Sequence, residues 1–595
     1  MKFLLTAVNA KYIHSNPAVY SLRAYAGKEN EKHIEIAEYT INQRTEVILA
    51  EIYKRRPDVI AFSCYIWNMT VIGQLLEELP KLLPEVPIWL GGPEVSFDAP
   101  QILEKYPGVS GVMAGEGEET FLALLQYYLA ETKTDLRQIA GLVFRCGREN
   151  VSTGVRELTD LSRLPFFYEN MEDFRNRIVY YESARGCPYR CSYCLSSIDK
   201  RVRFRDMETV KRELQFFFDS KVTQVKFVDR TFNCDRERTR EIWTYLTEHD
   251  NGITNFHFEI AADSMTEEEL ALLSPMRPGL VQLEIGVQSA NQQTLREINR
   301  FTDMDQIKKV VDTILKGENV HVHLDLIAGL PYEDYTSFGH SFDVVYRMHP
   351  HQLQLGFLKV LKGSPMHEKA AAYGINYTSA PPYEVLYSKW LPYEDVCRLK
   401  QIEEMVELYY NSNQFTHTLP VLEKAFASAF NLFEKLAGFY EENGYFTNSP
   451  SRSYRYEVLL AFACRYDRER EPLYRELLTY DLYLRENLKS RPVFAADLSV
   501  HKERVRSFYE REEKERRLLP SYRDCQAKQM AKMTHMEFFS YHVWEECGDR
   551  RAEKAVRNEA VLFDYKKRNP LTGEAEILVL TDETTKEREQ DDKEG

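Results

Sequence analysis

The chain has 595 residues and a formal net charge of −15, with 44% hydrophobic and 28% charged residues. Its length exceeds what one hydrophobic core supports and indicates about three or four domains. The composition is typical of a globular protein, and no apolar run is long enough to cross a bilayer, so we expect no membrane partner. The acidic balance argues against a broad nucleic-acid surface.

The N-terminal segment MKFLLTAVNAKYIH predicts a β-strand rather than a signal peptide. Asn9 and Lys11 interrupt its apolar run, and no small-residue cleavage site follows. We therefore expect a cytoplasmic protein. The ten cysteines are then free thiols or metal ligands rather than a disulfide framework.

Residues 1–140 alternate β-rich runs with helical stretches, which predicts a doubly wound, Rossmann-like parallel sheet. In such folds ligands bind at the carboxyl ends of the strands. Four glycines lie in the loops expected after the fourth and fifth strands. They would let the backbone approach a phosphate or a nucleotide-like tail, although tight strand-to-helix turns also explain them. The expected strands are 2–8, 33–39, 58–64, 86–90 and 110–114, and the glycines are Gly91, Gly92, Gly115 and Gly117.

A hairpin and linker are expected over residues 141–174, followed by a second α/β series over 175–370. Six β/α units predict a (β/α)6 partial TIM barrel, whose C-terminal edge carries the chemistry in related barrels. Its expected strands are 178–183, 224–229, 256–260, 281–286, 321–328 and 352–358.

The C-terminal part of the chain has a different pattern. Residues 371–580 are predicted to be mostly helical, with one hairpin at 560–580. Residues 581–595 form a charged segment that predicts a disordered tail.

Cys187, Cys191 and Cys194 form a C-x3-C-x2-C triplet just after the first barrel strand. Three thiolates can hold a 4Fe-4S cluster and leave one iron open to an amine and a carboxylate. A structural zinc ion is the alternative, but it normally recruits four ligands, and this loop holds no further Cys or His. Cys234, after the second strand, is more typical of a small buried hydrophobe than of a fourth ligand.

The triplet, with Tyr193 before its third cysteine, resembles the signature of the radical S-adenosylmethionine (SAM) superfamily. The resemblance implies that the cluster reductively cleaves SAM to a 5′-deoxyadenosyl radical, which abstracts a hydrogen atom. It also implies an electron donor such as flavodoxin or ferredoxin.

The segments that follow the later barrel strands resemble the SAM-binding motifs of the superfamily. FVDRTFN occupies the place of the methionine-binding motif, but Arg230 stands where related enzymes often have a second acid. LEIGVQSA and DLIAGLPYED, the latter with Pro331 and Glu333, resemble the motifs around ribose and adenine. The resemblance assigns no catalytic side chain, and the residues that it implies for SAM are Tyr193, Asp229, Glu259, Glu284, Gly286, Gln288, Ser289, Asp325 and Gly329.

The N-terminal domain resembles the cobalamin-binding domain of the cobalamin-dependent radical SAM subfamily, with GGPE and GEGE as landmarks. The resemblance therefore covers residues 1 to about 370 and implies cobalamin contacts from Gly91, Gly92, Gly115 and Glu116. The D-x-H-x-x-G motif of other cobalamin domains is absent, and His14 lies in the corresponding loop. We expect cobalamin to bind without a protein histidine ligand. The C-terminal region resembles an uncharacterised extension of some members.

The leading hypothesis is thus a cobalamin-dependent radical SAM enzyme that methylates an unactivated carbon of an unidentified substrate. One alternative is a methylthiotransferase-like radical SAM enzyme that modifies transfer RNA, which would need a second cysteine triplet in the N-terminal domain. Another is a non-enzymatic sensor or partner protein that uses an Fe-S cluster.

Overall fold

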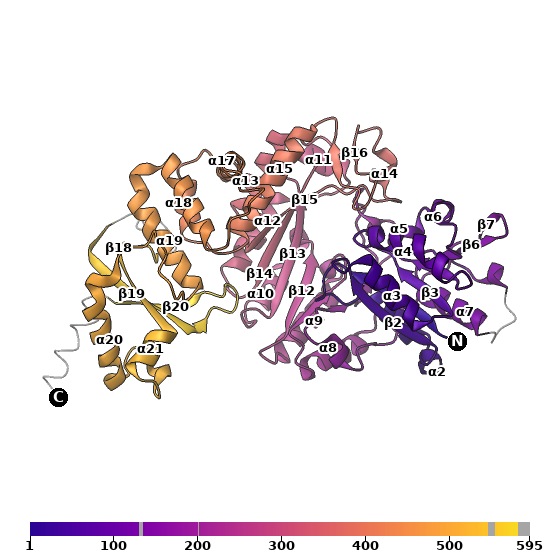
Figure 1. Cartoon of the computed structure of the whole chain (residues 1–595), viewed down its shortest axis with the longest axis horizontal. Helices are drawn as coiled ribbons and strands as arrows, with labels where there is room; N and C mark the ends of the chain where they lie inside the picture. The colour runs from indigo at the N-terminus through magenta and orange to yellow at the C-terminus, as the bar shows by residue number, and fades with distance from the viewer. Residues whose placement is uncertain (130–134, 200, 546–553, 581–595) are drawn as a thin grey trace. The chain divides into compact units, whose positions relative to one another are not determined.

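The computed structural model describes residues 1–129, 135–199, 201–545 and 554–580 (Figure 1). The chain divides into two compact units, residues 1–338 with 356–396 and residues 339–355 with 397–595. The predicted tail, residues 581–595, lies outside the described residues. Within the described residues, no helix is both long and apolar enough to cross a membrane.

The N-terminal part is built on a seven-stranded sheet with the order β2-β1-β3-β4-β5-β6-β7. Its first five strands are parallel, which confirms the predicted doubly wound sheet, and β6 and β7 form an antiparallel hairpin that pairs with β5. The strands are β1 Phe3–Asn9, β2 Ile34–Thr40, β3 Val59–Ser63, β4 Ile88–Gly91, β5 Gly111–Met113, β6 Leu142–Cys146 and β7 Glu149–Ser152.

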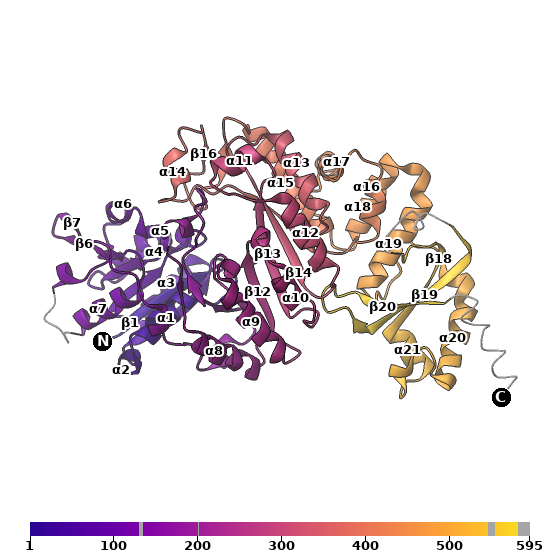
Figure 2. The same ribbon diagram turned by 180° about the vertical axis from the view of Figure 1, so that it is seen from behind.

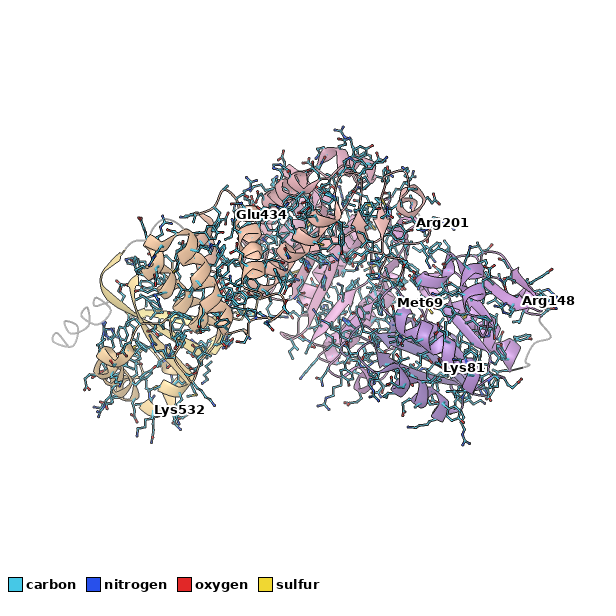
Figure 3. The ribbon with its side chains drawn as sticks, turned by 45° about the horizontal axis from the view of Figure 1, so that its top comes forward. Met69, Lys81, Arg148, Arg201, Glu434 and Lys532 are labelled. Atoms are coloured by element: carbon cyan, nitrogen blue, oxygen red, sulfur yellow. The ribbon has the colours of Figure 1, made fainter. Side chains whose placement is uncertain are left out.

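Helices cover both faces of this sheet. On one face, Leu4 and Val8 join a core with side chains of α3, α4 and α6, and on the other Phe3 packs edge-on against Phe121 of α7 with ring centroids 5.1 Å apart. At the end of α4, Lys81 pairs with Glu78 on the surface (Figure 3). The helices are α1 Pro17–Tyr25, α2 Lys28–Glu31, α3 Thr45–Arg55, α4 Met69–Leu82, α5 Pro93–Ser96, α6 Ala99–Lys105 and α7 Glu118–Tyr128.

A six-stranded parallel sheet follows, with the order β15-β14-β13-β12-β11-β8. Each predicted barrel strand is present, and alternate residues of β13 are buried, as expected for a sheet with helices outside it. The strands are β8 Val179–Tyr181, β11 Gln224–Phe227, β12 Asn255–Ile260, β13 Val281–Gln288, β14 His321–Ala328 and β15 Gln352–Phe357. The helices are α8 Met207–Asp219, α9 Arg236–Glu248, α10 Glu267–Leu273, α11 Gln292–Glu297, α12 Met304–Leu315 and α13 Tyr335–Tyr346, and the short strands β9 Ala184–Arg185 and β10 Arg203–Phe204 pair with each other.

Beyond the barrel, α14 Pro365–Lys369 and the short strands β16 Asn376–Tyr377 and β17 Val385–Tyr387 belong to the first unit. The second unit is mostly helical, as predicted, and contains a three-stranded antiparallel sheet (Figure 2). The predicted hairpin forms two of its strands, and β18 was not predicted. The elements are α15 Tyr393–Met405, α16 Thr418–Glu423, α17 Ala429–Glu442, α18 Tyr454–Tyr466, α19 Glu471–Arg485, α20 Lys502–Glu515, α21 Ala527–Met533, β18 Thr534–Tyr541, β19 Lys554–Arg568 and β20 Ala575–Leu580.

Candidate cofactor site

The three cysteines lie in one loop that begins directly after β9. Gly186 starts this loop with a φ of 98°, and a Cβ there would lie 2.3 Å from the backbone oxygen of Arg201, so the turn requires glycine. The Cys194 amide donates to the Cys191 carbonyl at 3.1 Å, and the Ser192 amide donates to Ile298. These backbone hydrogen bonds hold the part of the loop that carries Cys191 and Cys194.

Polar groups from other barrel elements surround the thiols. Arg300 Nη1 lies 3.6 Å from Cys191 Sγ, and Thr231 Oγ1 lies 3.6 Å from Cys187 Sγ. Burial raises the pKa of Cys187, so its thiolate needs a positive partner to form. The partly buried guanidinium of Arg300 beside Cys191 fits an anionic thiolate-ligated cluster, whose properties depend on hydrogen bonds to sulfur. Arg300 was not among the residues predicted from the sequence to lie at this site.

The described residues hold no group of three or more His, Cys, Asp or Glu side chains arranged to bind a single metal ion. Cys234 is half-buried, and burial raises its pKa to about 11.

Asp229 is buried at the end of β11, and both of its carboxylate oxygens are engaged by Ser183. The Ser183 amide donates to Oδ1 at 2.8 Å and the Ser183 hydroxyl donates to Oδ2 at 2.5 Å. Ser183 lies four residues before Cys187, so Asp229 anchors the start of the cysteine loop. A SAM contact from Asp229 remains a prediction.

The predicted SAM carboxylates of the next strands lie in a network of charges. Glu284 accepts from His257 Nε2 at 2.8 Å and lies 3.2 Å from Lys226 Nζ; although burial opposes it, these partners lower the pKa of Glu284 to about 2. His323 Nε2 lies 2.9 Å from Asp325 Oδ1.

Glu259 lies next to this network and has a weaker partner. Arg230 Nη1 is 3.8 Å from Glu259 Oε1, and burial raises the pKa of Glu259 to about 7. The carboxyl group of Glu259 therefore has a higher pKa than that of Glu284 and is protonated over a wider range of pH.

Gln288 ends β13 with a φ of 73°, next to a register shift between Gly286 and Gln288. Its Oε1 is buried and accepts no hydrogen bond from the residues that the structure describes, which fits a ligand that donates one, such as a ribose hydroxyl. A Cβ on Gly286 would lie 2.2 Å from Gln288 Nε2, so a larger residue there would displace this amide. An unusual φ at a strand end is common at functional sites.

The remaining predicted SAM residues lie around the same strand ends. The Ser289 hydroxyl donates to Glu333 Oε1 at 2.7 Å. Gly329 has a φ of 88°, and a Cβ there would lie 2.7 Å from Val385 Cγ1. Tyr193 packs beside the core cluster that contains Leu295 and Leu330, and burial raises its pKa.

A cavity of about 700 Å³ opens at the carboxyl edge of the N-terminal sheet. Its lining includes the predicted cobalamin residues and one cluster ligand, namely Gly91, Gly92, Gly115, Glu116 and Cys194. Gly92 has a φ of 113°, and a Cβ there would lie 2.4 Å from the Cys64 carbonyl, so the turn admits only glycine. The glycine loops and the cysteine loop therefore face one space.

Glu116 lines this cavity and is already engaged by protein groups. Arg203 Nη1 donates to Glu116 Oε2 at 3.1 Å, and the Thr159 amide donates to the same oxygen at 2.8 Å. His14 lines a neighbouring cavity, where its Nδ1 lies 2.6 Å from the Tyr180 hydroxyl. Burial lowers the pKa of His14.

Family profiles match all three regions of the chain. The B12 binding domain profile matches residues 4–125, and the Radical SAM superfamily profile matches residues 181–345. The chain therefore combines a B12-binding domain with a radical SAM domain. Its cofactors are accordingly a 4Fe-4S cluster, SAM and cobalamin. Residues 371–563 match a protein family of unknown function, DUF4080.

Several curated proteins resemble this radical SAM protein over part of its length. The cobalamin-dependent radical SAM methyltransferase TokK of Streptomyces tokunonensis is 27% identical over 348 residues, which cover 54% of this chain and 50% of TokK. The anaerobic magnesium-protoporphyrin IX monomethyl ester cyclase of Cereibacter sphaeroides is 23% identical over 333 residues, 51% of this chain and 52% of the cyclase. The chain thus spans about half the length of these curated relatives.

Two solved structures share the fold at lower identity. The radical SAM methyltransferase TsrM of Kitasatospora setae, with cobalamin and a 4Fe-4S cluster bound, aligns with a TM-score of 0.51 at 17% identity, over 64% of this chain and 79% of TsrM. The cobalamin-dependent radical SAM enzyme OxsB with aqua-cobalamin bound aligns with a TM-score of 0.51 at 15% identity, over 80% of both chains.

Proposed function

We propose that the protein is a cobalamin-dependent radical SAM enzyme that methylates an unactivated carbon of a small molecule. The observation that carries this proposal is the cavity lined by both Gly92 and Cys194. It supports a site in which a corrinoid and a cluster face one substrate. The names of TokK and TsrM support methyl transfer as the reaction, whereas the cyclase shows that similar chains are assigned to other chemistry.

When bound, the cluster and SAM supply a hydrogen-abstracting radical and cobalamin supplies a methyl group. The chain's own residues then have distinct tasks. The cysteine loop would hold the cluster, with Arg300 stabilising the thiolate of Cys191. The amide of Gln288 would accept a hydrogen bond from SAM, and Gly92 keeps the edge of the sheet open to the corrinoid.

A reductant must deliver an electron to the cluster, and we propose a small carrier such as flavodoxin or ferredoxin. The free cysteines of the described residues support a cytoplasmic location, where thiols stay reduced.

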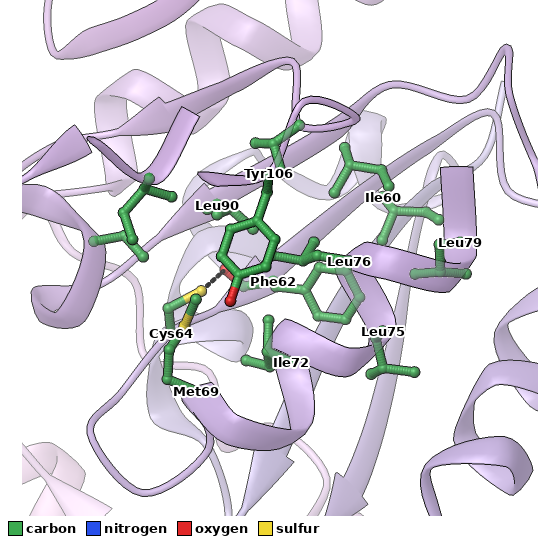
Figure 4. Close-up of a cluster of buried hydrophobic side chains, with 14 of the residues drawn as sticks. Ile60, Phe62, Cys64, Met69, Ile72, Leu75, Leu76, Leu79, Leu90 and Tyr106 are labelled. Carbon is green, nitrogen blue, oxygen red and sulfur yellow. Dashed lines mark hydrogen bonds between the residues drawn. The ribbon is translucent and has the colours of Figure 1, made fainter. Parts of the chain in front are cut away.

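The transfer-RNA methylthiotransferase alternative has less support. Cys64 is fully buried among core side chains, including Met69, Ile72 and Tyr106, and its Sγ lies 3.6 Å from the Phe62 carbonyl (Figure 4). Cys146 accepts from Arg137 at 3.2 Å. Neither cysteine belongs to a triplet.

Anaerobic reconstitution with cluster, cobalamin, SAM and reductant tests the proposal. We expect 5′-deoxyadenosine and S-adenosylhomocysteine to form in the presence of substrate, and Cys191→Ala to abolish both. Deoxyadenosine without S-adenosylhomocysteine would contradict methylation. A cluster-replete sample that never cleaves SAM would favour the sensor alternative.

A further inference from the structure

A second cavity, of about 750 Å³, lies beside the cofactor cavity in the first unit. Loops of the N-terminal sheet and the start of the barrel line it, and its surface is mostly apolar. Its volume falls in the range of small-molecule sites. Tyr65, Trp67 and Arg230 line both cavities, so these side chains stand at their boundary.

Aromatic rings form part of the wall. Tyr65 and Trp67, after β3, stack with ring centroids 4.4 Å apart and an interplanar angle of 10°, and 43% of Trp67 is exposed. Phe167, in the linker before β8, stacks on Tyr20 at 6.0 Å. Each of these rings already stacks on a neighbouring ring. Ordering them when a flat ligand binds would therefore cost little conformational entropy.

The acids of this cavity already have cationic partners. Arg185 Nη2 lies 2.8 Å from both Glu118 Oε1 and Glu182 Oε2. Asp199 lies 3.2 Å from Arg203 Nη2, which also pairs with Glu116.

Arg230 is held less closely by carboxylates than Arg185 and Arg203 are. Its side chain is 55% exposed, and its contact to Glu259, at 3.8 Å, exceeds hydrogen-bond distance. A guanidinium in this position offers a planar fork to a carboxylate.

We propose that this cavity is the substrate chamber and that it takes a small molecule with a flat conjugated ring and a carboxylate, the ring beside Trp67 and the carboxylate on Arg230. Its role as a substrate chamber rests on the proposed function, whereas the binding itself does not. Because Trp67 and Arg230 both also line the cofactor cavity, the ring and the carboxylate of the bound molecule would both lie at the boundary between the two spaces.

Equilibrium dialysis of the full chain, loaded with cluster and cobalamin, tests the binding with 2-naphthoate as the probe. The cationic 2-naphthylmethylamine, the neutral 2-naphthol and the ring-free anion decanoate test charge and shape. We expect 2-naphthoate to bind at least about tenfold more tightly than the amine or decanoate, a difference of about 1.4 kcal/mol. A preference for the amine or for decanoate would overturn the proposal.

Matched variants locate the probe. Trp67→Leu is expected to weaken 2-naphthoate about tenfold or more. Arg230→Gln is expected to weaken 2-naphthoate by a similar factor and leave 2-naphthol unchanged, whereas Arg230→Lys keeps the preference for the anion. Arg240, whose exposed guanidinium pairs with Glu268 outside the cavity, provides the control, and Arg240→Gln should bind like the wild type. Unchanged 2-naphthoate affinity in Arg230→Gln or Trp67→Leu would refute the assignment.

SAM cleavage by the same preparation separates the two proposals. A protein that forms 5′-deoxyadenosine but fails to bind 2-naphthoate would overturn the chamber and leave the proposed function standing. A protein that binds 2-naphthoate through Arg230 but never cleaves SAM would support the binding site and contradict the proposed function.

Discussion

Arg185, two residues before the first cysteine of the triplet, donates from Nη2 to Glu118 Oε1 of the N-terminal domain at 2.8 Å. The neighbouring Glu116 pairs with Arg203 of β10, and although burial opposes it, Arg203 and Arg185 lower the pKa of Glu116 to about 2. We call Glu116, Glu118, Arg185 and Arg203 the loop clamp. It joins the GEGE loop to the cysteine loop and so fixes the distance between the two cofactor-binding edges.

Removal of Arg185 should destabilise the first unit. Arg185→Gln leaves Glu118 and Glu182 without their shared cation in a largely buried place, and the expected loss is about 3 kcal/mol. Denaturant unfolding measures it. Arg240→Gln, which breaks an exposed pair, should cost less than about 1 kcal/mol. Equal losses in the two variants would show that the clamp adds no more stability than an exposed ion pair.

The two glycine turns of the cofactor cavity should respond differently to alanine. At Gly92 a Cβ would lie 2.4 Å from the backbone oxygen of Cys64, so Gly92→Ala must move the β4 turn and should abolish corrinoid binding. At Gly115 no atom lies within 4 Å of the added Cβ, and the φ of 86° alone should cost about 1–2 kcal/mol. The corrinoid absorption of purified protein and the unfolding midpoint measure the two effects. Normal corrinoid content in Gly92→Ala would contradict this assignment.

The raised pKa of Glu259 predicts a dependence of stability on pH. Burial raises its folded pKa to about 7, so its contribution to stability is complete below the pKa of the unfolded chain and is lost as the pH rises through about 7. The neutral variant Glu259→Gln should therefore melt a few degrees above the wild type at about pH 8 and at the same temperature at about pH 5. The exposed Glu267→Gln is the control and should change neither midpoint. An equal rise at both pH values would point to packing instead.

The positions of the strands along the chain and the place of the cysteine loop were accessible from sequence because they follow from local patterns. β-rich runs predicted the eleven parallel strands of the two sheets, and the C-x3-C-x2-C spacing identified the loop. The partners of charged side chains were not accessible. Asp229 was assigned to SAM from its position, yet its oxygens hold Ser183, and Arg300 reaches Cys191 from 109 residues away. Such pairings depend on how distant loops meet, which a single sequence does not encode locally. Arg185 lies two residues before Cys187, and this position was the available signal.

Alanine variants of the cysteines distinguish a 4Fe-4S cluster from a zinc site. Alanine at Cys187, Cys191 or Cys194 should remove the cluster absorption and the bound iron, whereas Cys234→Ala should retain both, because a cluster open at one iron uses three thiolates. Iron and zinc analysis of anaerobically purified protein measures this. Stoichiometric zinc that disappears in Cys234→Ala would instead establish a four-ligand zinc site.

Gln288 combines an unfavourable backbone conformation with a buried acceptor, and two substitutions separate these properties. Gln288→Gly and Gln288→Ala both remove the amide, so both should weaken SAM binding about tenfold, equal to about 1.4 kcal/mol. Only glycine adopts the φ of 73° without strain, so Gln288→Gly should be about 1 kcal/mol more stable than Gln288→Ala. Equilibrium dialysis with SAM and denaturant unfolding give the two quantities. If the alanine variant bound SAM normally, the orphaned acceptor would have a structural rather than a ligand-binding role, and the strain at the end of β13 would need a different explanation.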